Sequence, residues 1–186
     1  MLVTSEKAQL TTGNHVLDNR PMLRDSNLVP LSRQHQHALA LCVRINRAGL
    51  STAAELAAWQ AEIQQHVELE IQYHFAAEES YIFPVALRFA ELRPLIEELL
   101  KEHAELRSYF LQASKRSLDR EGLLRFAELL TGHIRKEERR LFEAMQEKMN
   151  AEELAQIGAN VDRALEAASE ACITPTETLL KRHIET

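Results

Sequence analysis

The chain has 186 residues, of which 45% are hydrophobic and 5% aromatic, with few glycines and prolines and a formal net charge of -6. This length is enough for one domain with a sizeable core, and the composition favours a compact helical protein over a disordered or β-rich one. Because acids and bases are interspersed, the sequence excludes a nucleic-acid-binding protein with a basic patch.

The sequence also indicates where the protein resides. The first 20 residues lack the apolar run of a signal peptide, and no stretch approaches the roughly 20 apolar residues that a membrane span needs. Neither Cys42 nor Cys172 lies in a C-x-x-C pair, so no thiolate metal site is indicated. We therefore expect a cytoplasmic protein that does not bind a membrane.

Five helices are predicted in chain order, each opened by a capping residue or by a proline in its first turn. They run from Ser32 to about Arg47, from Thr52 to about Ser80, from Pro94 to about Lys115, from Asp119 to about Met149 and from Asn150 to about Ala171. Glu55 and Glu153 complete capping boxes at the second and fifth helices, and Pro84 disturbs the end of the second. A short final helix after Pro175 also fits the pattern.

Four long helices joined by short loops predict an all-α fold, an antiparallel up-down-up-down four-helix bundle with an extra C-terminal helix. We expect residues 1–27 to be a loosely packed lead-in, residues 28–149 to form the bundle and residues 150–186 to be a helical extension. The extension either covers the bundle or mediates a homodimer.

Two stretches place the same polar pair on apolar helices: "HFAAEESYIFP", beginning at His74, and "HIRKEERRLFE", beginning at His133. Each contains His-x-x-x-Glu, then a second Glu and an apolar cluster. At about 100° per residue, His74 points along the apolar stripe of its helix, together with Tyr81, and Glu78 lies about 40° away. On the fourth helix Glu137 lies about 40° from the stripe and His133 about 80°, while Glu138 competes with Glu137 from the other side.

The first and third helices each add one inward histidine. His35 shares its direction with leucines and His103 lies at the centre of an apolar face, whereas His37 points about 160° away from His35. Burying two carboxylates without partners costs several kcal/mol each, more than a marginally stable domain can spare. Protonated histidines would neutralise them but would repel one another. A metal site resolves the conflict, because imidazole and carboxylate suit iron, manganese and zinc.

The order His, His-x-x-x-Glu, His, His-x-x-x-Glu, over about residues 28–149, resembles the hemerythrin-like (HHE cation-binding) family. The resemblance implies a four-helix bundle around two iron ions joined by an oxo or hydroxo bridge. It also implies six metal ligands, with both glutamates bridging the ions: His35, His74, Glu78, His103, His133 and Glu137.

One position departs from the family pattern. Oxygen-carrying hemerythrins have a second histidine on the third helix, four residues beyond the first, and here that residue is Arg107. Four histidines instead of five weaken the case for reversible oxygen carriage. The sequence leaves open whether three further carboxylates, Glu70, Glu102 and Glu138, contact metal.

The expected function is therefore that of a di-iron protein that binds or reacts with a small ligand, namely O₂, NO or peroxide. We expect Leu99, Tyr81 and Phe110 to be part of an apolar lining that keeps bulk water out. Two alternatives remain open: an iron-handling or iron-sulfur-repair-type protein, and a metal-free structural bundle. The repair-type branch of the family carries an N-terminal cysteine, and the first 30 residues here contain none.

Overall fold

The computed structural model describes residues 23–173, and all regular secondary structure in this range is helical. The predicted helix after Pro175 lies outside these residues. The chain passes along the bundle four times. The first and third passes are α1 (Val29–Arg47) and α5 (Arg93–Ser114), the latter preceded by the short η3 (Ala90–Leu92). The second pass joins α2 (Ala53–His66), η1 (Val67–Ile71), α3 (Gln72–Ala77), η2 (Glu78–Ile82) and α4 (Phe83–Ala86), and the fourth joins α6 (Arg120–Lys136), η4 (Glu137–Leu141) and α7 (Phe142–Lys148).

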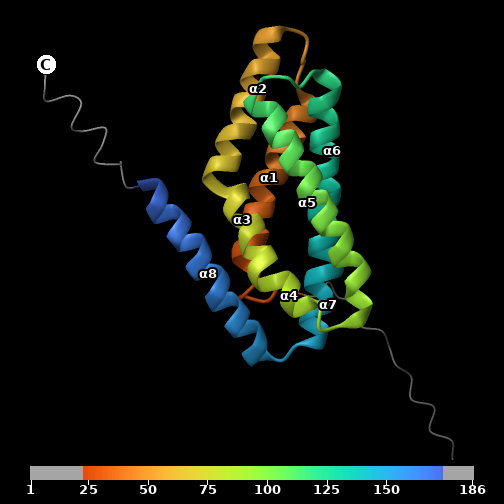
Figure 1. The fold of residues 1–186 in the computed structure, drawn as a ribbon, viewed down its shortest axis with the longest axis vertical. Coiled ribbons are helices and arrows are strands. Elements are labelled where there is room, and N and C mark those ends of the chain that lie inside the picture. Colours follow the sequence, from red (N-terminus) through yellow and green to blue (C-terminus); the bar gives the residue numbers. More distant parts are fainter. Residues whose placement is uncertain (1–22, 174–186) are drawn as a thin grey trace, which may run out of the picture.

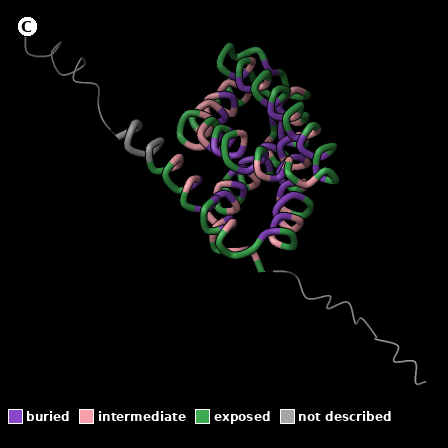
Figure 2. The backbone as a smooth tube through the Cα atoms, turned by 60° about the horizontal axis from the view of Figure 1, so that its bottom comes forward, coloured by how far each residue is buried: buried purple, intermediate pink, exposed green. Residues whose placement is uncertain are grey.

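These passes form the predicted antiparallel four-helix bundle, to which α8 (Ala151–Ile173) is added (Figure 1). Helix α1 packs against α6, and α5 packs against both α2 and α6. The buried positions line the inside of the bundle (Figure 2). They form two apolar clusters, one around Phe110 and Phe126 and the other around Phe83 and Phe142. The buried polar residues belong to neither cluster.

Side-chain caps fix three of the helix starts where the sequence predicted them. The Glu55 backbone N–H donates to Thr52 Oγ1 at 3.2 Å, and the Thr52 N–H donates to Glu55 Oε2 at 2.9 Å, which completes the capping box. Asp119 accepts from the Gly122 N–H at 2.8 Å. The pair Asn150 and Glu153 opens α8 in the same way. Each of these bonds satisfies a backbone donor that the first turn of a helix leaves unpaired.

The first helix begins earlier than predicted. Ser32 is not its cap, because the Ser32 N–H already donates to the Leu28 carbonyl at 3.1 Å inside the first turn. Pro30 lies in that turn, where a missing N–H costs nothing, and Leu28 is fully buried. An apolar anchor therefore positions the start of α1 in place of a side-chain cap.

Residues 23–173 contain three π-helical segments, and two of them begin at the glutamates of the repeated motif. The Phe83 N–H donates to the Glu78 carbonyl, and the Phe142 N–H donates to the Glu137 carbonyl, each across five residues. A π turn holds one more residue than an α turn, so it shifts the direction of the side chains that follow, and such turns are frequent at functional sites. Tyr81 is 36% exposed for this reason, and the prediction that it faces the core is wrong.

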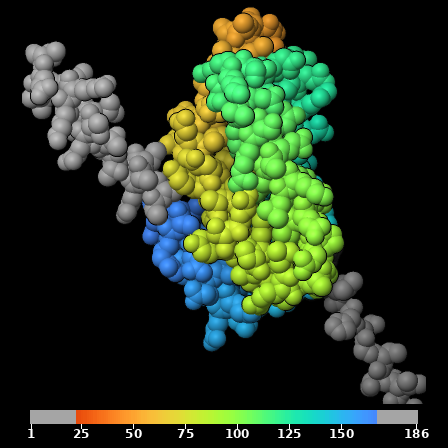
Figure 3. All heavy atoms as spheres, viewed as in Figure 1, coloured from red at the N-terminus to blue at the C-terminus, as the bar shows by residue number. Residues whose placement is uncertain are grey.

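The extension packs onto the bundle. Helix α8 contacts α3 and η2 and lies obliquely along one side of the molecule, as the space-filling view also shows (Figures 1 and 3). Leu154, Ile157 and Val161 are buried in the apolar cluster around Phe142. Helix α8 therefore covers part of the bundle, and its role in a homodimer stays a prediction.

Gly158→Ala is expected to destabilise the protein. A Cβ at Gly158 lies 2.6 Å from Asn27 Oδ1 and 2.7 Å from Asn27 Cβ, and that side chain is held by Asp25. Such overpacking costs about 1–3 kcal/mol, which outweighs the gain of roughly 0.5–1 kcal/mol that alanine brings to a helix. Gly132→Ala is the matched control, because a Cβ there meets no atom within 4 Å and should stabilise. Urea unfolding measures both, and equal stabilisation by the two changes would contradict the close approach of α8.

Candidate metal centre

All six ligands predicted from the sequence converge in the middle of the bundle. Each pass of the chain contributes one histidine, and the two glutamates are the first residues of η2 and η4. None of the six is more than 5% exposed: His35, His74, Glu78, His103, His133 and Glu137. Their donor atoms form two overlapping groups, within each of which they lie within 4.8 Å of one another. That these residues bind metal stays a prediction, but their arrangement is suited to a dinuclear site.

The four histidines form two close pairs. The Nε2 atoms of His35 and His74 are 2.9 Å apart, and those of His103 and His133 are 3.0 Å apart. Neighbouring ligands at right angles around one ion, with bonds of about 2.1 Å, are separated by about 3 Å. Each pair can therefore serve one ion, which gives the two histidines per metal expected from the repeated motif.

The two glutamates connect the histidine pairs. Glu78 Oε1 lies 3.2 Å from His74 Nε2, while its Oε2 lies 3.4 Å from His103 Nε2. Glu137 Oε2 lies 3.1 Å from His35 Nε2, while its Oε1 lies 3.2 Å from His133 Nε2. Each carboxylate thus presents one oxygen to each pair, which is the geometry that a bridging ligand requires.

Each of the four histidines of the site makes a hydrogen bond through Nδ1, the ring nitrogen that faces away from the centre. The Nδ1 atoms lie 2.7 Å from Glu138 for His35, 2.9 Å from Gln34 for His74, 2.8 Å from Glu79 for His103 and 3.1 Å from Glu102 for His133. Ionised carboxylates and the amide oxygen of Gln34 only accept hydrogen bonds, so each Nδ1 is the donor and each Nε2 is directed into the site. This arrangement orients metal-binding histidines and raises their basicity.

The three carboxylates behind the histidines stay ionised. Burial opposes ionisation, but the hydrogen bond from His35 outweighs it and lowers the pKa of Glu138 to about 2. Burial is likewise outweighed at Glu79, by Arg107 and His103, and at Glu102, by His133 and Lys136, so that both pKa values are lowered. Each carboxylate also pairs with a basic side chain: Glu138 with Arg24, Glu79 with Arg107 and Glu102 with Lys136.

The centre of the site contains more hydrogen-bond acceptors than donors. With the Nδ1 protons directed outward, four Nε2 lone pairs face four carboxylate oxygens, and none of the Glu78 or Glu137 oxygens has a hydrogen-bond partner. Buried carboxylates in this state need positive charge. Without metal, protons supply it: burial opposes a charged imidazole, but nearby glutamates raise the pKa of His35 to about 9 and that of His133 to about 10. Metal ions satisfy the same acceptors directly.

The remaining polar candidates lie outside this centre. His37 is 59% exposed and pairs with Glu70 at 3.0 Å, so the prediction that His35 faces inward and His37 faces solvent is confirmed. Glu70 is therefore not among the converging donors. Arg107, which replaces the fifth histidine of the oxygen carriers, is 47% exposed and directs its guanidinium to Glu79.

Two residues of the site were missed by the sequence analysis. Gln34 and Glu79 received no role, although they stand next to predicted ligands in the chain. The repeated motif could have revealed them. In both halves, a residue able to accept a hydrogen bond comes directly before the lone histidine, and a glutamate comes directly after the bridging glutamate. Gln34 and Glu102 occupy the first position, and Glu79 and Glu138 occupy the second.

His35→Ala is expected to lower the metal content of the purified protein, whereas His37→Ala is expected to leave it unchanged. The first change removes an Nε2 donor from the centre, and the second removes only a surface contact with Glu70. Elemental analysis after reconstitution measures both variants. Metal loss in His37→Ala with full metal in His35→Ala would mean that α1 is rotated.

Comparison with known families agrees with this geometry. The family model of the hemerythrin HHE cation binding domain matches residues 28–145, which is more than half of the chain. The chain therefore belongs to the hemerythrin HHE cation-binding family. The searches of curated proteins and of solved structures found no match. Among the helices of residues 23–173, none is long and apolar enough to cross a membrane.

Proposed function

We propose that this protein is a non-haem di-iron protein that binds or reacts with a small ligand such as O₂, NO or peroxide. The observation that carries the proposal is the convergence of four imidazole nitrogens and four carboxylate oxygens in two overlapping, buried groups. Mixed imidazole and carboxylate donors in a bundle core are typical of di-iron carboxylate proteins. Iron bound there supplies a redox-active centre for small oxidants and gases.

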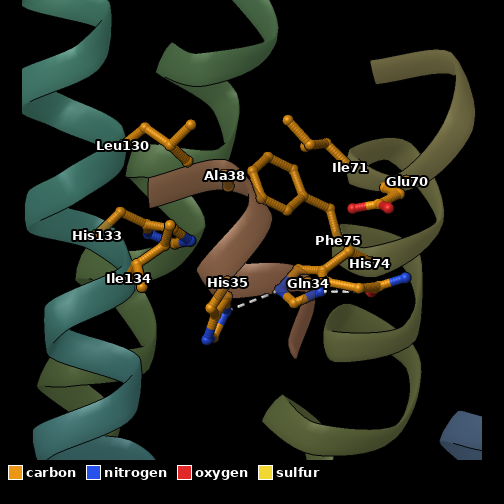
Figure 4. Close-up of a pocket in the computed structure, with 10 residues that line it drawn as sticks. All are labelled: Gln34, His35, Ala38, Glu70, Ile71, His74, Phe75, Leu130, His133 and Ile134. Carbon is orange, nitrogen blue, oxygen red and sulfur yellow. Dashed lines mark hydrogen bonds between the residues drawn. The ribbon is translucent and has the colours of Figure 1, made fainter. Parts of the chain in front are cut away.

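A cavity beside the histidines supports a small ligand. It offers about 20 Å³ to the centre of a water-sized molecule, enough for about one such molecule, and its exposed lining is almost entirely apolar. Figure 4 shows the residues around it, which are Gln34, His35, Ala38, Glu70, Ile71, His74, Phe75, Leu130, His133 and Ile134. Leu99 and Phe110, which were expected in the apolar lining of the site, are buried but do not line this cavity, although Phe110 belongs to the same apolar cluster as Phe75.

The side chains of the site have separate tasks in this proposal. Glu78 and Glu137 neutralise positive charge at both positions, while the outer carboxylates hold the imidazole rings in place. Phe75 stacks on His103 with ring centroids 3.7 Å apart and limits movement of that ring. Apolar cavity walls keep bulk water away, which favours an uncharged guest over an ion. A larger substrate does not fit in this space.

Iron content and reactivity test the proposal together. Protein reconstituted with iron is expected to bind about two ions per chain, measured by elemental analysis and by the optical spectrum. Stopped-flow mixing of the reduced protein with O₂, NO and peroxide then separates binding from turnover. Less than one ion per chain contradicts the di-iron assignment. Two ions with no response to any of the three ligands favours the iron-handling alternative.

Ala38→Leu tests the cavity independently of the metal. Ala38 lines the cavity and is 6% exposed, so a leucine fills the space that a small ligand would enter. We expect unchanged iron content with slower ligand binding in stopped-flow traces. Ala40→Leu on the same helix, at an exposed position, is the matched control. Equal binding rates in both variants would show that the cavity is not the route to the site.

A further inference from the structure

The outer hydrogen bonds follow the same doubled pattern as the inner residues. In each half, the residue before the lone histidine holds the histidine of the His-x-x-x-Glu motif: Gln34 holds His74 and Glu102 holds His133. The glutamate that follows each bridging glutamate holds the lone histidine of the other half, so that Glu79 holds His103 and Glu138 holds His35. The two metal positions are thus supported by equivalent contacts.

This symmetry is broken at one place only among the four contacts. Three histidines donate a hydrogen bond to a carboxylate, but His74 donates to the amide oxygen of Gln34. A charged acceptor makes a hydrogen bond about twice as strong as a neutral one and pulls more strongly on the imidazole proton, so it makes the opposite nitrogen a better donor to metal. An amide oxygen supplies neither the charge nor the same increase in basicity.

We infer that the two metal positions differ in affinity, that the position of His35 and His74 holds its ion less tightly, and that Gln34 sets this difference. The inference rests on the proposed dinuclear function. At the other position both histidines, His103 and His133, are held by carboxylates. Lys136 offsets part of the Glu102 charge, but the carboxylate remains the direct acceptor from His133.

The expected size of the effect follows from the behaviour of such outer contacts in other metal sites. Changing one of them typically alters metal affinity by about 10–100-fold. Gln34 is only partly buried, so a glutamate at this position keeps contact with solvent. The exchange Gln34→Glu therefore makes the two positions alike with little strain on the fold.

Release of ferrous iron to a chromogenic chelator tests the inference on the full-length, reduced, iron-loaded protein. The parent protein is expected to release its two ions in two phases, the first at least about tenfold faster than the second. Gln34→Glu should slow the fast phase about tenfold or more, and Glu102→Gln should accelerate the slow phase until the two merge. Glu105→Gln, an exposed position on α5 with the same chemical change, should leave both phases unchanged.

Single-position variants identify the phases. His35→Ala should remove the fast phase and His103→Ala the slow one. The inference is overturned if the parent protein releases its iron in a single phase. It is also overturned if Gln34→Glu does not slow the fast phase and Glu102→Gln does not accelerate the slow phase. Failure of the proposed function gives a different result, because the reconstituted parent protein then holds less than one ion per chain before the chelator is added.

Discussion

Glu78→Ala is expected to remove both metal ions, whereas His103→Ala is expected to leave about one ion per chain. Glu78 presents one oxygen to each histidine pair, so its loss removes a ligand and a negative charge from both positions. His103 belongs to only one of the two groups of donors. Elemental analysis of the reconstituted variants measures the difference, and Glu137→Ala should behave like Glu78→Ala.

The stability of the folded protein should rise and fall with its metal content. A ligand that binds only the folded state adds about 2.7 kcal/mol when its concentration is a hundredfold above its dissociation constant. Chelation should therefore lower the melting temperature of the parent protein and change that of either glutamate variant little. Unchanged metal content in both glutamate variants would show that neither carboxylate bridges the two ions.

The neighbouring Glu138 is the control for this prediction. It lies behind His35 and is not among the converging donors, so Glu138→Ala should weaken one position and leave two ions bound at high metal concentration. If Glu138→Ala instead empties the site while Glu137→Ala keeps full metal, the acid that bridges the ions is Glu138.

Removing the metal is expected to destabilise the protein far more at pH 9 than at pH 6. In the metal-free protein burial opposes a charged imidazole, but Glu137 and its neighbours raise the pKa of His35 to about 9 and that of His133 to about 10. Both values lie above the ordinary 6.5. The stability that these protons provide is therefore complete below pH 6.5 and is lost as the pH rises through 9 and 10. For His35 alone this amounts to roughly 3 kcal/mol.

The loaded protein responds in the opposite sense. Metal needs both imidazoles without their Nε2 protons, so protons compete with it less as the pH rises. The gap in melting temperature between loaded and chelated protein should therefore widen from pH 6 to pH 9, which calorimetry at several pH values measures. Glu78→Ala, treated in the same way, should show little gap at any pH. A gap that is constant or narrows with pH would contradict the exchange of protons for metal.

Helix type and the choice of inward residues followed from local patterns. Capping pairs such as Thr52 with Glu55 act within one turn, so their outcome depends on residues close in the chain. The direction of His74 relative to the apolar stripe is also a local property of a regular helix. The prediction failed at Tyr81, because the π turn at η2 breaks the regular period. At the start of α1 it failed because burial of Leu28 replaces a cap.

Spacing along single helices was enough to predict a helical bundle with His35, His74, Glu78 and His103 directed inward. The same spacing left His133 at the edge of the apolar stripe and Glu137 in competition with Glu138, so these two assignments rested on the family resemblance. Only the tertiary structure showed which histidines pair, that each glutamate spans both pairs, and that Glu79 and Glu138 support rings on other helices. These relations join helices far apart in the chain, and they depend on the rotation and shift of one helix against another. Packing of the whole core sets those two quantities, and a single helical pattern contains neither.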